Sequence, residues 1–373
     1  MSQESFIIKE YQIEECQIEE CQPGDVEKVR ALFASCYGRS SDRYPSSAEW
    51  DWRYRSGVYD STIWLAKWRQ RLVAQRPTVI KTVKIGQEYH AAAHFMDVMT
   101  HPEFRYRGLF TRLLRWATAA VTEQGAVICY SFPNENSYPG YVKKTDWAPV
   151  DGLSLFIKPV RAEPILRERV RSQPLRNVLA LLLQPGLALV TREGRRAGVA
   201  GVSVRRLASF DQRFDAFWDQ VAEEYEVIIR RDSQHLNWRY VHRPSIEYAI
   251  YVAEKGEGIQ GFIVVRTRQM FGMNLGMIIE LLVSNGNQAV ARALVARGVQ
   301  HLLDVGAEAV ACVLPDHLSY RQALRQEGFV RVPEALMPRR FYFMVRVNQD
   351  DQTLKKALDR RNWYLAWGDN DAV

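Results

Sequence analysis

Asp97-Val-Met-Thr-His-Pro-Glu-Phe-Arg-Tyr-Arg-Gly-Leu-Phe-Thr111 links a predicted strand to a predicted helix. Residues 93–100 mix small and β-branched side chains, as a half-buried strand does, and Pro102 ends the strand because it has no N–H to donate. Apolar side chains then recur at helical spacing over residues 109–121. The N-terminus of such a helix offers unpaired N–H groups and a positive dipole end, and Gly108 lets the backbone approach a ligand closely. We therefore predict that this loop binds phosphate.

The loop also carries a recognisable pattern. Arg105-Tyr-Arg-Gly108-Leu-Phe110 resembles the Arg/Gln-x-x-Gly-x-Gly/Ala loop that binds the coenzyme A pyrophosphate in the GCN5-related N-acetyltransferase (GNAT) superfamily. The order strand, loop, amphipathic helix and strand, the last at residues 126–132, agrees with that family. Phe110 departs from the pattern, because the family has a small residue there. The alternative interpretation is an ordinary strand-helix turn.

The resemblance implies that acetyl-CoA, or another acyl-CoA, is a co-substrate. An amine of the acceptor would attack the thioester directly, and a main-chain N–H of the strand before the loop would stabilise the thioester oxygen. The residues implied to contact the coenzyme are Val98, Met99, Thr100, Arg105, Tyr106, Arg107, Gly108, Leu109, Phe110, Thr111 and Asn134.

The family's acid and base have several candidates here. Asp97, His94 and Glu135 could take the amine proton. Asp97 is favoured because it adjoins the expected oxyanion donor, although Glu280 at the matching place in the second half makes a structural role an equal alternative. A histidine on an otherwise apolar strand is more often a core residue.

A tyrosine usually protonates the departing thiolate in this family. Tyr138 and Tyr141 are available. Tyr141 is the better candidate because it lies seven residues after Asn134, as in the family, and because Tyr138 is repeated as Tyr320 in the second half. Alternatively, the Tyr141 ring only packs in the cleft.

Two segments occur twice in the chain. Trp50-Asp-Trp-Arg-Tyr54 recurs as Leu236-Asn-Trp-Arg-Tyr240, and Phe132-Pro-Asn-Glu-Asn-Ser-Tyr138 corresponds to Leu314-Pro-Asp-His-Leu-Ser-Tyr320. The repeat predicts two α/β domains, each a mixed, twisted sheet flanked by helices. Because Trp52, Arg53 and Tyr54 are duplicated, they are more readily explained as core and helix-end anchors than as an acceptor pocket.

The expected organisation follows from this repeat. We predict a GNAT domain at 15–155, a basic linker at 156–201, a degenerate GNAT-like domain at 202–346 and a tail at 347–373. The coenzyme loop occurs once, because its counterpart, Val283-Ser-Asn-Gly-Asn-Gln-Ala289, is shorter and has no arginine. By analogy with tandem GNAT proteins, the second domain would shape the acceptor pocket or the domain interface.

Composition narrows the class of protein. The 373 residues are 47% hydrophobic and 25% charged, which is ordinary for a globular protein. No apolar run opens the chain, and residues 178–190 are interrupted by Gln184, Pro185 and Gly186, so a cytoplasmic protein is expected. Five scattered cysteines without a Cys-x-x-Cys pair predict reduced thiols and no metal site.

Residues 158–206 contain eleven Lys or Arg against three Glu. One interpretation is a solvated helical connector, and the other is a platform for an acidic acceptor or an anionic membrane surface. Nucleic acid is the least favoured partner, because no aromatic residue lies between Phe156 and Phe210 to stack on bases.

The hypothesis that these observations favour is an acyl-CoA-dependent N-acyltransferase, most simply an acetyltransferase, acting on an amine of a small molecule or a sugar. One alternative is an aminoacyl transferase of the Fem type, which has two GNAT-like halves but lacks the coenzyme loop. Another is a non-catalytic protein that keeps the coenzyme as a ligand.

Overall fold

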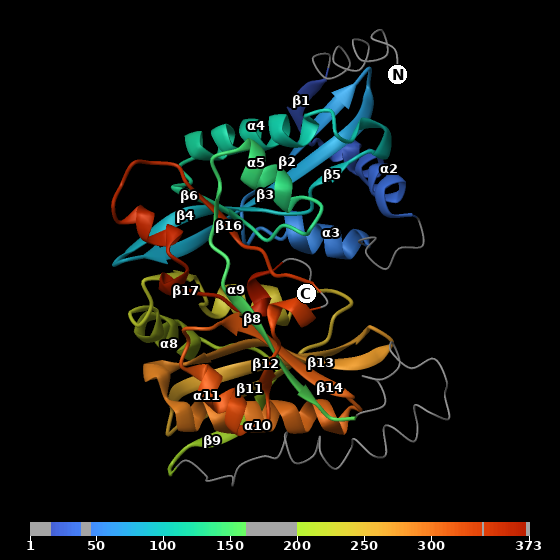
Figure 1. Cartoon of the computed structure of the whole chain (residues 1–373). Coiled ribbons are helices and arrows are strands. Elements are labelled where there is room, and N and C mark those ends of the chain that lie inside the picture. Colours follow the sequence, from blue (N-terminus) through green and yellow to red (C-terminus); the bar gives the residue numbers. More distant parts are fainter. Residues whose placement is uncertain (1–15, 39–45, 162–199, 338, 371–373) are drawn as a thin grey trace, which may run out of the picture. The chain divides into compact units, whose positions relative to one another are not determined.

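The chain divides into two compact units, each of which joins segments distant in sequence. The first comprises residues 1–151 and 341–360, and the second comprises residues 152–340 and 361–373. Each unit is a mixed sheet flanked by helices (Figure 1), which confirms the predicted α/β fold class. The computed structural model describes residues 16–38, 46–161, 200–337 and 339–370.

In the first unit the strand order is β1-β2-β3-β4-β6-β16-β7. Neighbouring strands are antiparallel, except that β4 and β6 run parallel. The strands are β1 (Gln17–Glu20), β2 (Ser61–Trp68), β3 (Arg71–Ile85), β4 (Glu88–Phe95), β5 (Met99–Thr100), β6 (Ile128–Ser131), β7 (Ala148–Pro149) and β16 (Met344–Val347). The helices are η1 (Pro23–Asp25), α2 (Val26–Tyr37), α3 (Ser47–Tyr54), η2 (Pro102–Phe104), α4 (Leu109–Glu123), α5 (Tyr138–Lys144) and η5 (Leu354–Leu358).

Side chains alternate along each strand, so both faces of this sheet carry apolar residues, and helices cover both faces. On β2, Trp64 and Ala66 belong to the core that α4 and α5 cover, whereas Ile63 and Leu65 belong to the core that α2 and α3 cover. Figure 1 shows α3 and α4 on opposite sides of these strands. The predicted apolar stripe of residues 109–121 is thereby buried on the sheet.

The second unit repeats this plan with the order β15-β8-β14-β13-β12-β11-β9, in which only β13 and β14 are parallel neighbours. β10 and β17 pair with each other in parallel. The strands are β8 (Leu153–Pro159), β9 (Ser203–Leu207), β10 (Val227–Ile229), β11 (Ala249–Lys255), β12 (Gly258–Met270), β13 (Met273–Val283), β14 (Ala309–Pro315), β15 (Val330–Arg331) and β17 (Trp363–Tyr364). The helices include α8 (Arg213–Ala222), α9 (Ser233–Tyr240), η3 (Ser284–Gly286), α10 (Gln288–Asp304), α11 (Tyr320–Gln326), η4 (Glu334–Leu336) and η7 (Trp367–Asp369).

The last strand of each expected half belongs to the sheet of the other unit. β8 begins at the end of the expected segment 15–155 and extends past it, but it pairs with β14 of the second unit. β16 closes the expected segment 202–346, but it pairs with β6 of the first unit. The expected halves and the compact units therefore differ by an exchange of one strand.

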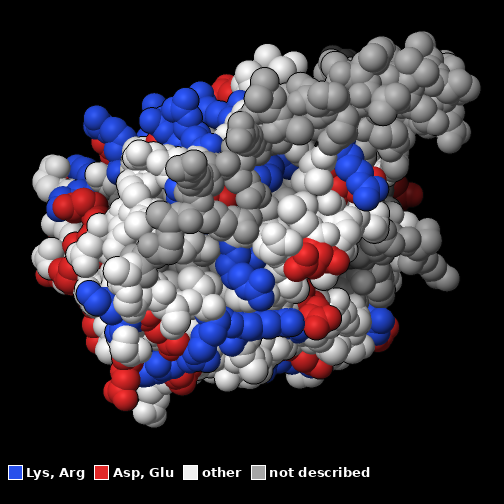
Figure 2. Space-filling view, turned by 90° about the horizontal axis from the view of Figure 1, so that it is seen from below, with Lys and Arg blue, Asp and Glu red and all other residues white. Residues whose placement is uncertain are grey.

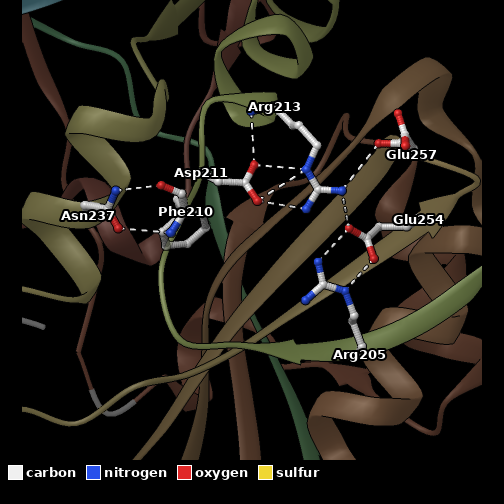
Figure 3. Close-up of polar contacts among 7 residues, drawn as sticks. All are labelled: Arg205, Phe210, Asp211, Arg213, Asn237, Glu254 and Glu257. Carbon is white, nitrogen blue, oxygen red and sulfur yellow. Dashed lines mark hydrogen bonds and ion pairs between the residues drawn. The ribbon is translucent and has the colours of Figure 1, made fainter.

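An ion-pair cluster holds the edge of the second sheet. Arg205 of β9 and Arg213 of α8 both contact Glu254 of β11, at 2.6 and 2.8 Å (Figure 3). The hydrogen bonds from Arg205 are the main cause that lowers the pKa of Glu254 below its ordinary value. In the same view, the Asn237 side chain bonds both backbone groups of Phe210. These contacts fix β9 and the start of α8 to the sheet.

The predicted basic linker lies mostly at residues 162–199, outside the described residues. At the described ends of the basic segment 158–206, Lys158 is buried and donates to the Glu327 carbonyl at 2.8 Å, and Arg205 is paired with Glu254. On the face shown in Figure 2, basic and acidic side chains are interspersed among neutral ones. The described ends of this basic segment thus include cations that serve the fold.

Other predictions from composition concern thiols and membranes. The five cysteines are free thiols, and burial raises the pKa of Cys129 to about 12. Among the described residues, no group of three or more His, Cys, Asp or Glu is arranged to hold a metal ion. Nor does any described helix combine the length and apolar character needed to cross a bilayer.

Candidate active site

β4 and β6 separate at a fork in the first unit. Their parallel pairing ends at Phe95 and Ser131, and the chain then continues as β5, which pairs with β3 alone. Phe95 lies opposite Thr78, and Met99 lies opposite Gln75. Four residue steps from Phe95 to Met99 therefore match three steps on β3. The extra residue forms a bulge at 96–98, where Asp97 adopts a φ of 43°. The predicted continuous strand 93–100 is therefore interrupted.

The bulge exposes a backbone donor. Val98 is half-buried, and its N–H donates to none of the residues that the structure describes. By contrast, the carbonyl of Thr100 accepts from Arg105 Nε at 3.2 Å and from Cys36 Sγ at 3.4 Å. A half-buried N–H without a protein acceptor, at the point where two strands diverge, is suited to a ligand oxygen.

Asp97 is anchored by a charged network. Its Oδ2 accepts hydrogen bonds from Arg53 Nη1 and from Tyr54 Oη, each at 2.5 Å, and its side chain is 35% exposed. The second unit repeats one of these contacts, because Tyr240 Oη donates to Glu280 Oε2 at 2.8 Å. The tyrosine-acid contact thus serves the fold in both units, beside any role of Asp97 in catalysis.

The other two candidate bases lie in different surroundings. His94 is fully buried and its ring stacks on Tyr130, with centroids 4.5 Å apart and planes 9° apart. Glu135 is exposed in the turn before α5. His94 therefore occupies a core position, as expected for a histidine on an apolar strand.

The predicted phosphate loop leads directly into α4. Gly108 is the N-cap of α4 with a φ of 88°, and no side chain caps the helix. Tyr106 also has a positive φ, 63°, and its side chain is fully exposed. The first-turn N–H groups of a fifteen-residue helix thus face outward at a glycine with open space around it.

The two loop arginines are held in different ways. Arg105 donates to the Thr100 carbonyl, which ties the loop to β5. The Arg107 guanidinium lies over the Phe104 ring, 5.3 Å from its centroid. Both cations therefore stay beside the α4 N-terminus, where they favour an anion.

The equivalent helix in the second unit is closed to an anion. The Asn287 side chain caps α10 by accepting from the N–H groups of Ala289 and Val290, both at 3.2 Å. Asn285 N–H donates to the Glu224 carboxylate. The helix N-terminus that is open in the first unit is therefore occupied by the protein's own acceptors in the second.

Tyr141 lies at the apex of the fork. It is buried, and its hydroxyl donates to Ser131 Oγ at 3.1 Å and accepts from Arg76 Nη1 at 2.9 Å. Ser131 in turn donates to the Phe95 carbonyl at 2.9 Å. This chain of hydrogen bonds connects Tyr141 to the last paired residues of β4 and β6.

Phe110, the departure from the family pattern, packs inside this site. Its ring centroid lies 5.4 Å from that of Tyr141 and 4.6 Å from Arg76 Cζ. A Cβ at Gly140 would come within 2.6 Å of the Phe110 ring, so Gly140 makes room for it. The large residue in the loop is thus accommodated by a small residue on α5 and by a cation beneath it.

The arginine at the apex has no counterpart in the second unit. Phe95 and Ile278 are equivalent because both end the parallel pairing, opposite Ser131 and Cys312 respectively. Phe95 pairs with Thr78 on β3, and Ile278 pairs with Val265 on β12. Arg76 and Ile263 each lie two residues before these partners, so they are equivalent, and Ile263 is fully buried. Sequence reasoning missed Arg76, because a single arginine inside a strand carries no motif. The alternation of side chains along β3 could have indicated that Arg76 points into the protein.

Asn134 lies at the start of α5. Its Oδ1 accepts from the N–H groups of Asn136 and Ser137, at 3.0 and 3.1 Å, which forms the turn that begins the helix. Tyr138 stacks on Tyr342 with centroids 4.0 Å apart. The structure thus places Asn134 near Tyr141 along the chain, with its oxygen engaged in the turn.

A groove of about 1400 Å³ extends from Gly108 along the outer side of α4. Leu109 is buried at the helix start, whereas Thr111 lines the groove. Basic side chains predominate among its charged residues, which are Arg112, Arg115, Glu123, Lys143, Lys144, Asp146 and Arg346. The groove therefore continues the positive surroundings of the loop.

Known proteins share this architecture. Residues 17–150 match the family model described as Acetyltransferase (GNAT) domain. This segment is similar to GNAT domains. The family identification confirms the predicted resemblance for the first half and supports acyl-CoA-dependent N-acyl transfer as its general chemistry. No protein of curated function matches the sequence.

Solved structures resemble this chain along most of its length. A probable N-acyltransferase from Enterococcus faecalis aligns with a TM-score of 0.61 at 12% identity, covering 91% of this chain and 74% of its own. A GCN5-related N-acetyltransferase from Anabaena variabilis aligns with a TM-score of 0.60 at 9% identity, covering 89% and 72%. N-myristoyltransferase from Saccharomyces cerevisiae, with bound myristoyl-CoA, aligns with a TM-score of 0.55 at 13% identity, covering 88% and 82%. At these identities the likeness concerns the fold.

Proposed function

We propose that this protein transfers an acyl group, most simply acetyl, from acyl-CoA to an amine of a small molecule or a sugar. The observation that carries the proposal is the uncapped N-terminus of α4 behind Gly108, placed next to the fork between β4 and β6. A helix N-terminus with backbone N–H groups open to solvent favours a pyrophosphate. The two arginines of the loop and the basic groove along α4 support the same ligand.

In this proposal the coenzyme reaches from the loop into the fork. The pyrophosphate binds at residues 105–111, and the phosphorylated adenosine end lies in the groove beside Arg112 and Arg115. The thioester oxygen accepts from Val98 N–H, so the negative charge that develops on it in the transition state is stabilised. Met99 and Thr100 hold that donor in place by pairing with β3.

The chemical steps follow from direct attack. The acceptor nitrogen forms a bond to the thioester carbon, the carbon–sulfur bond breaks, and the nitrogen loses a proton. Tyr141 gives its proton to the departing thiolate and is reprotonated from solvent, which receives the amine proton from Asp97. Asp97 lies next to the oxyanion donor and takes the amine proton, directly or through water.

Features of the second unit argue against a coenzyme site there. Its helix N-terminus is capped by Asn287. In addition, Tyr364, Leu365 and Ala366 of the chain's last segment share a small, nearly filled cavity with β13 and β14, at the place that corresponds to the fork. The proposal therefore assigns coenzyme binding to the first unit alone.

Calorimetric titration with acetyl-CoA tests the proposal. Gly108→Glu places bulk and negative charge at the expected pyrophosphate position and should abolish binding, whereas wild type should bind with micromolar affinity. Gly125→Glu is the matched control, because Gly125 also has a positive φ, 95° against 88°, and open space around its Cβ at the opposite end of α4. A folded wild type that binds no acyl-CoA, or equal binding by both variants, would refute the proposal.

A further inference from the structure

Arg76 is a buried cation whose hydrogen-bonding capacity is only partly used. Its exposure is 0%, and Nη1 donates to Tyr141 Oη at 2.9 Å. Nε and Nη2 have no hydrogen-bond partner among the residues that the structure describes. These two nitrogens form one edge of the planar guanidinium, which is the edge that binds a carboxylate through two parallel hydrogen bonds.

Nothing in the fold itself requires an arginine here. A buried charge without an anion is costly, and the Phe110 ring 4.6 Å from Cζ offsets only part of that cost. The second unit builds the same strand with Ile263 at the equivalent place. Among the described residues no carboxylate forms an ion pair with Arg76. The cation therefore points to an anion that the protein does not supply.

The position of Arg76 limits the part of the substrates that can carry this anion. Through Tyr141 and Ser131, Arg76 is connected to the apex of the fork, where the reacting ends of both substrates would meet. The coenzyme phosphates would bind at the α4 N-terminus instead. The group near Arg76 is thus the acyl end of the donor or a substituent of the acceptor.

We propose that the Nε and Nη2 edge of Arg76 binds a carboxylate carried by one of the two substrates. Its source is either the free end of a dicarboxylic acyl-CoA or the carboxylate of an amino-acid acceptor. This inference rests on the proposed function, because it places the carboxylate at the same fork. The half-buried Phe110 ring covers the guanidinium, so the carboxylate enters as that ring turns aside.

The donor arm of the test compares acyl groups of equal length. Calorimetry measures the affinity for succinyl-CoA against butyryl-CoA, and for malonyl-CoA against propionyl-CoA. If the donor carries the carboxylate, wild type binds the carboxylated member about tenfold more tightly or better. Arg76→Met brings this ratio close to one. Arg76→Lys keeps the charge but loses the paired edge, and it gives an intermediate ratio.

The acceptor arm compares amino acids with their amides as acceptors of acetyl groups, by the release of free CoA. If the acceptor carries the carboxylate, kcat/KM for the acid exceeds that for the amide about tenfold or more in wild type. The preference disappears in Arg76→Met. Ile263→Met, at the equivalent position of the second unit, is the control and keeps the wild-type ratio.

The outcomes separate this inference from the proposed function. Acetyl-CoA binding by wild type without a carboxylate preference in either arm would overturn the inference alone. Thermal unfolding shows which of Arg76→Met and Arg76→Lys is folded. If the folded variants retain the carboxylate preference of wild type, the inference is also overturned. Failure of wild type to bind any acyl-CoA would overturn both proposals together.

Discussion

Tyr141 is buried, and among the described residues its hydroxyl has two hydrogen-bond partners, Arg76 and Ser131. Tyr141→Phe removes this hydroxyl and keeps the ring that packs on Phe110 and Trp147. If Tyr141 protonates the thiolate, we expect kcat to fall by about 10²-fold or more while KM for acyl-CoA changes little. Steady-state release of free CoA with an active amine measures both constants.

Tyr138→Phe is the control for that measurement. Tyr138 lies on the same helix, and its ring stacks on Tyr342 outside the Arg76 network. We expect its kcat to match wild type. An equal kcat for Tyr141→Phe and wild type would show that the Tyr141 ring only packs in the fork.

A second residue-scale prediction concerns pH. Asp25 accepts hydrogen bonds from Lys28 and Lys67, both at 2.9 Å, and these are the main causes that lower its pKa from 3.8 to about 2. Because the folded pKa lies below the unfolded one, the stabilisation is present above about pH 4 and is lost as the pH falls towards 2.

Thermal unfolding of wild type and Asp25→Asn across this range measures the effect. We expect wild type to be the more stable protein above about pH 4 and the difference to shrink towards about pH 2. Asp51→Asn, at an exposed carboxylate 3.6 Å from Arg55, serves as the comparison and should show a much smaller difference. A gap between wild type and Asp25→Asn that stays constant with pH would contradict the assignment.

Single residues also show where sequence reasoning reached its limit. Gly108 and the loop arginines could be predicted because their chemistry depends on neighbours within a few positions. Arg76 and Ser131 are separated by 55 positions, and both reach the Tyr141 hydroxyl only when β3, β6 and α5 are assembled. The interior partners of Tyr141 therefore required the fold.

At the scale of elements, local periodicity was enough for the helices. α4 begins at Leu109, as the sequence predicts. The bulge at 96–98 was not predictable, because a bulge is defined by the register of β4 and β5 against β3. The bulge that would position the proposed oxyanion donor could therefore not be predicted from the sequence pattern.

The last segment of the chain gives an element-scale prediction. Asp369 pairs with Arg231 at 2.6 Å, and both side chains are at least 97% buried. Gly368 passes so close to side chains of α9 and β13 that a Cβ would lie 2.0 Å from Tyr240 Oη and 2.9 Å from Glu280 Oε2. Gly368→Ala must displace one of these groups, so we expect a loss of about 1–3 kcal/mol in the free energy of unfolding.

Chemical denaturation of the full chain measures this loss. Gly258→Ala in the same unit is the control, because the nearest atoms to its added Cβ lie at an ordinary 3.5 Å. We expect that control to stay within about 0.5 kcal/mol of wild type. Equal stability of the two variants would mean that the segment is not held against β13 as described.

At the scale of the whole molecule, the internal repeat predicted two similar domains but not the exchange of their last strands. β8 and β16 occupy equivalent places in the two sheet orders. The buried residues Phe156 and Val345 are typical of either position, so side-chain pattern alone does not choose between the sheets. Only the pairing, β8 with β14 and β16 with β6, distinguishes them.

This exchange makes a prediction about fragments. The expected domain 15–155 lacks β16, whose Met344 and Val345 are fully buried against β6. Without that strand, β6 becomes an exposed edge with unpaired backbone groups, which favours aggregation over folding. We expect residues 16–155 alone to give no cooperative thermal transition by circular dichroism and no binding of acetyl-CoA by calorimetry. Fusing residues 341–360 to this fragment through a flexible Gly/Ser linker should restore both, because it returns Met344 and the Asn348 side chain that bonds the Ala126 carbonyl at 2.7 Å. Cooperative unfolding of 16–155 without the fused segment would show that the first unit does not depend on the exchanged strand.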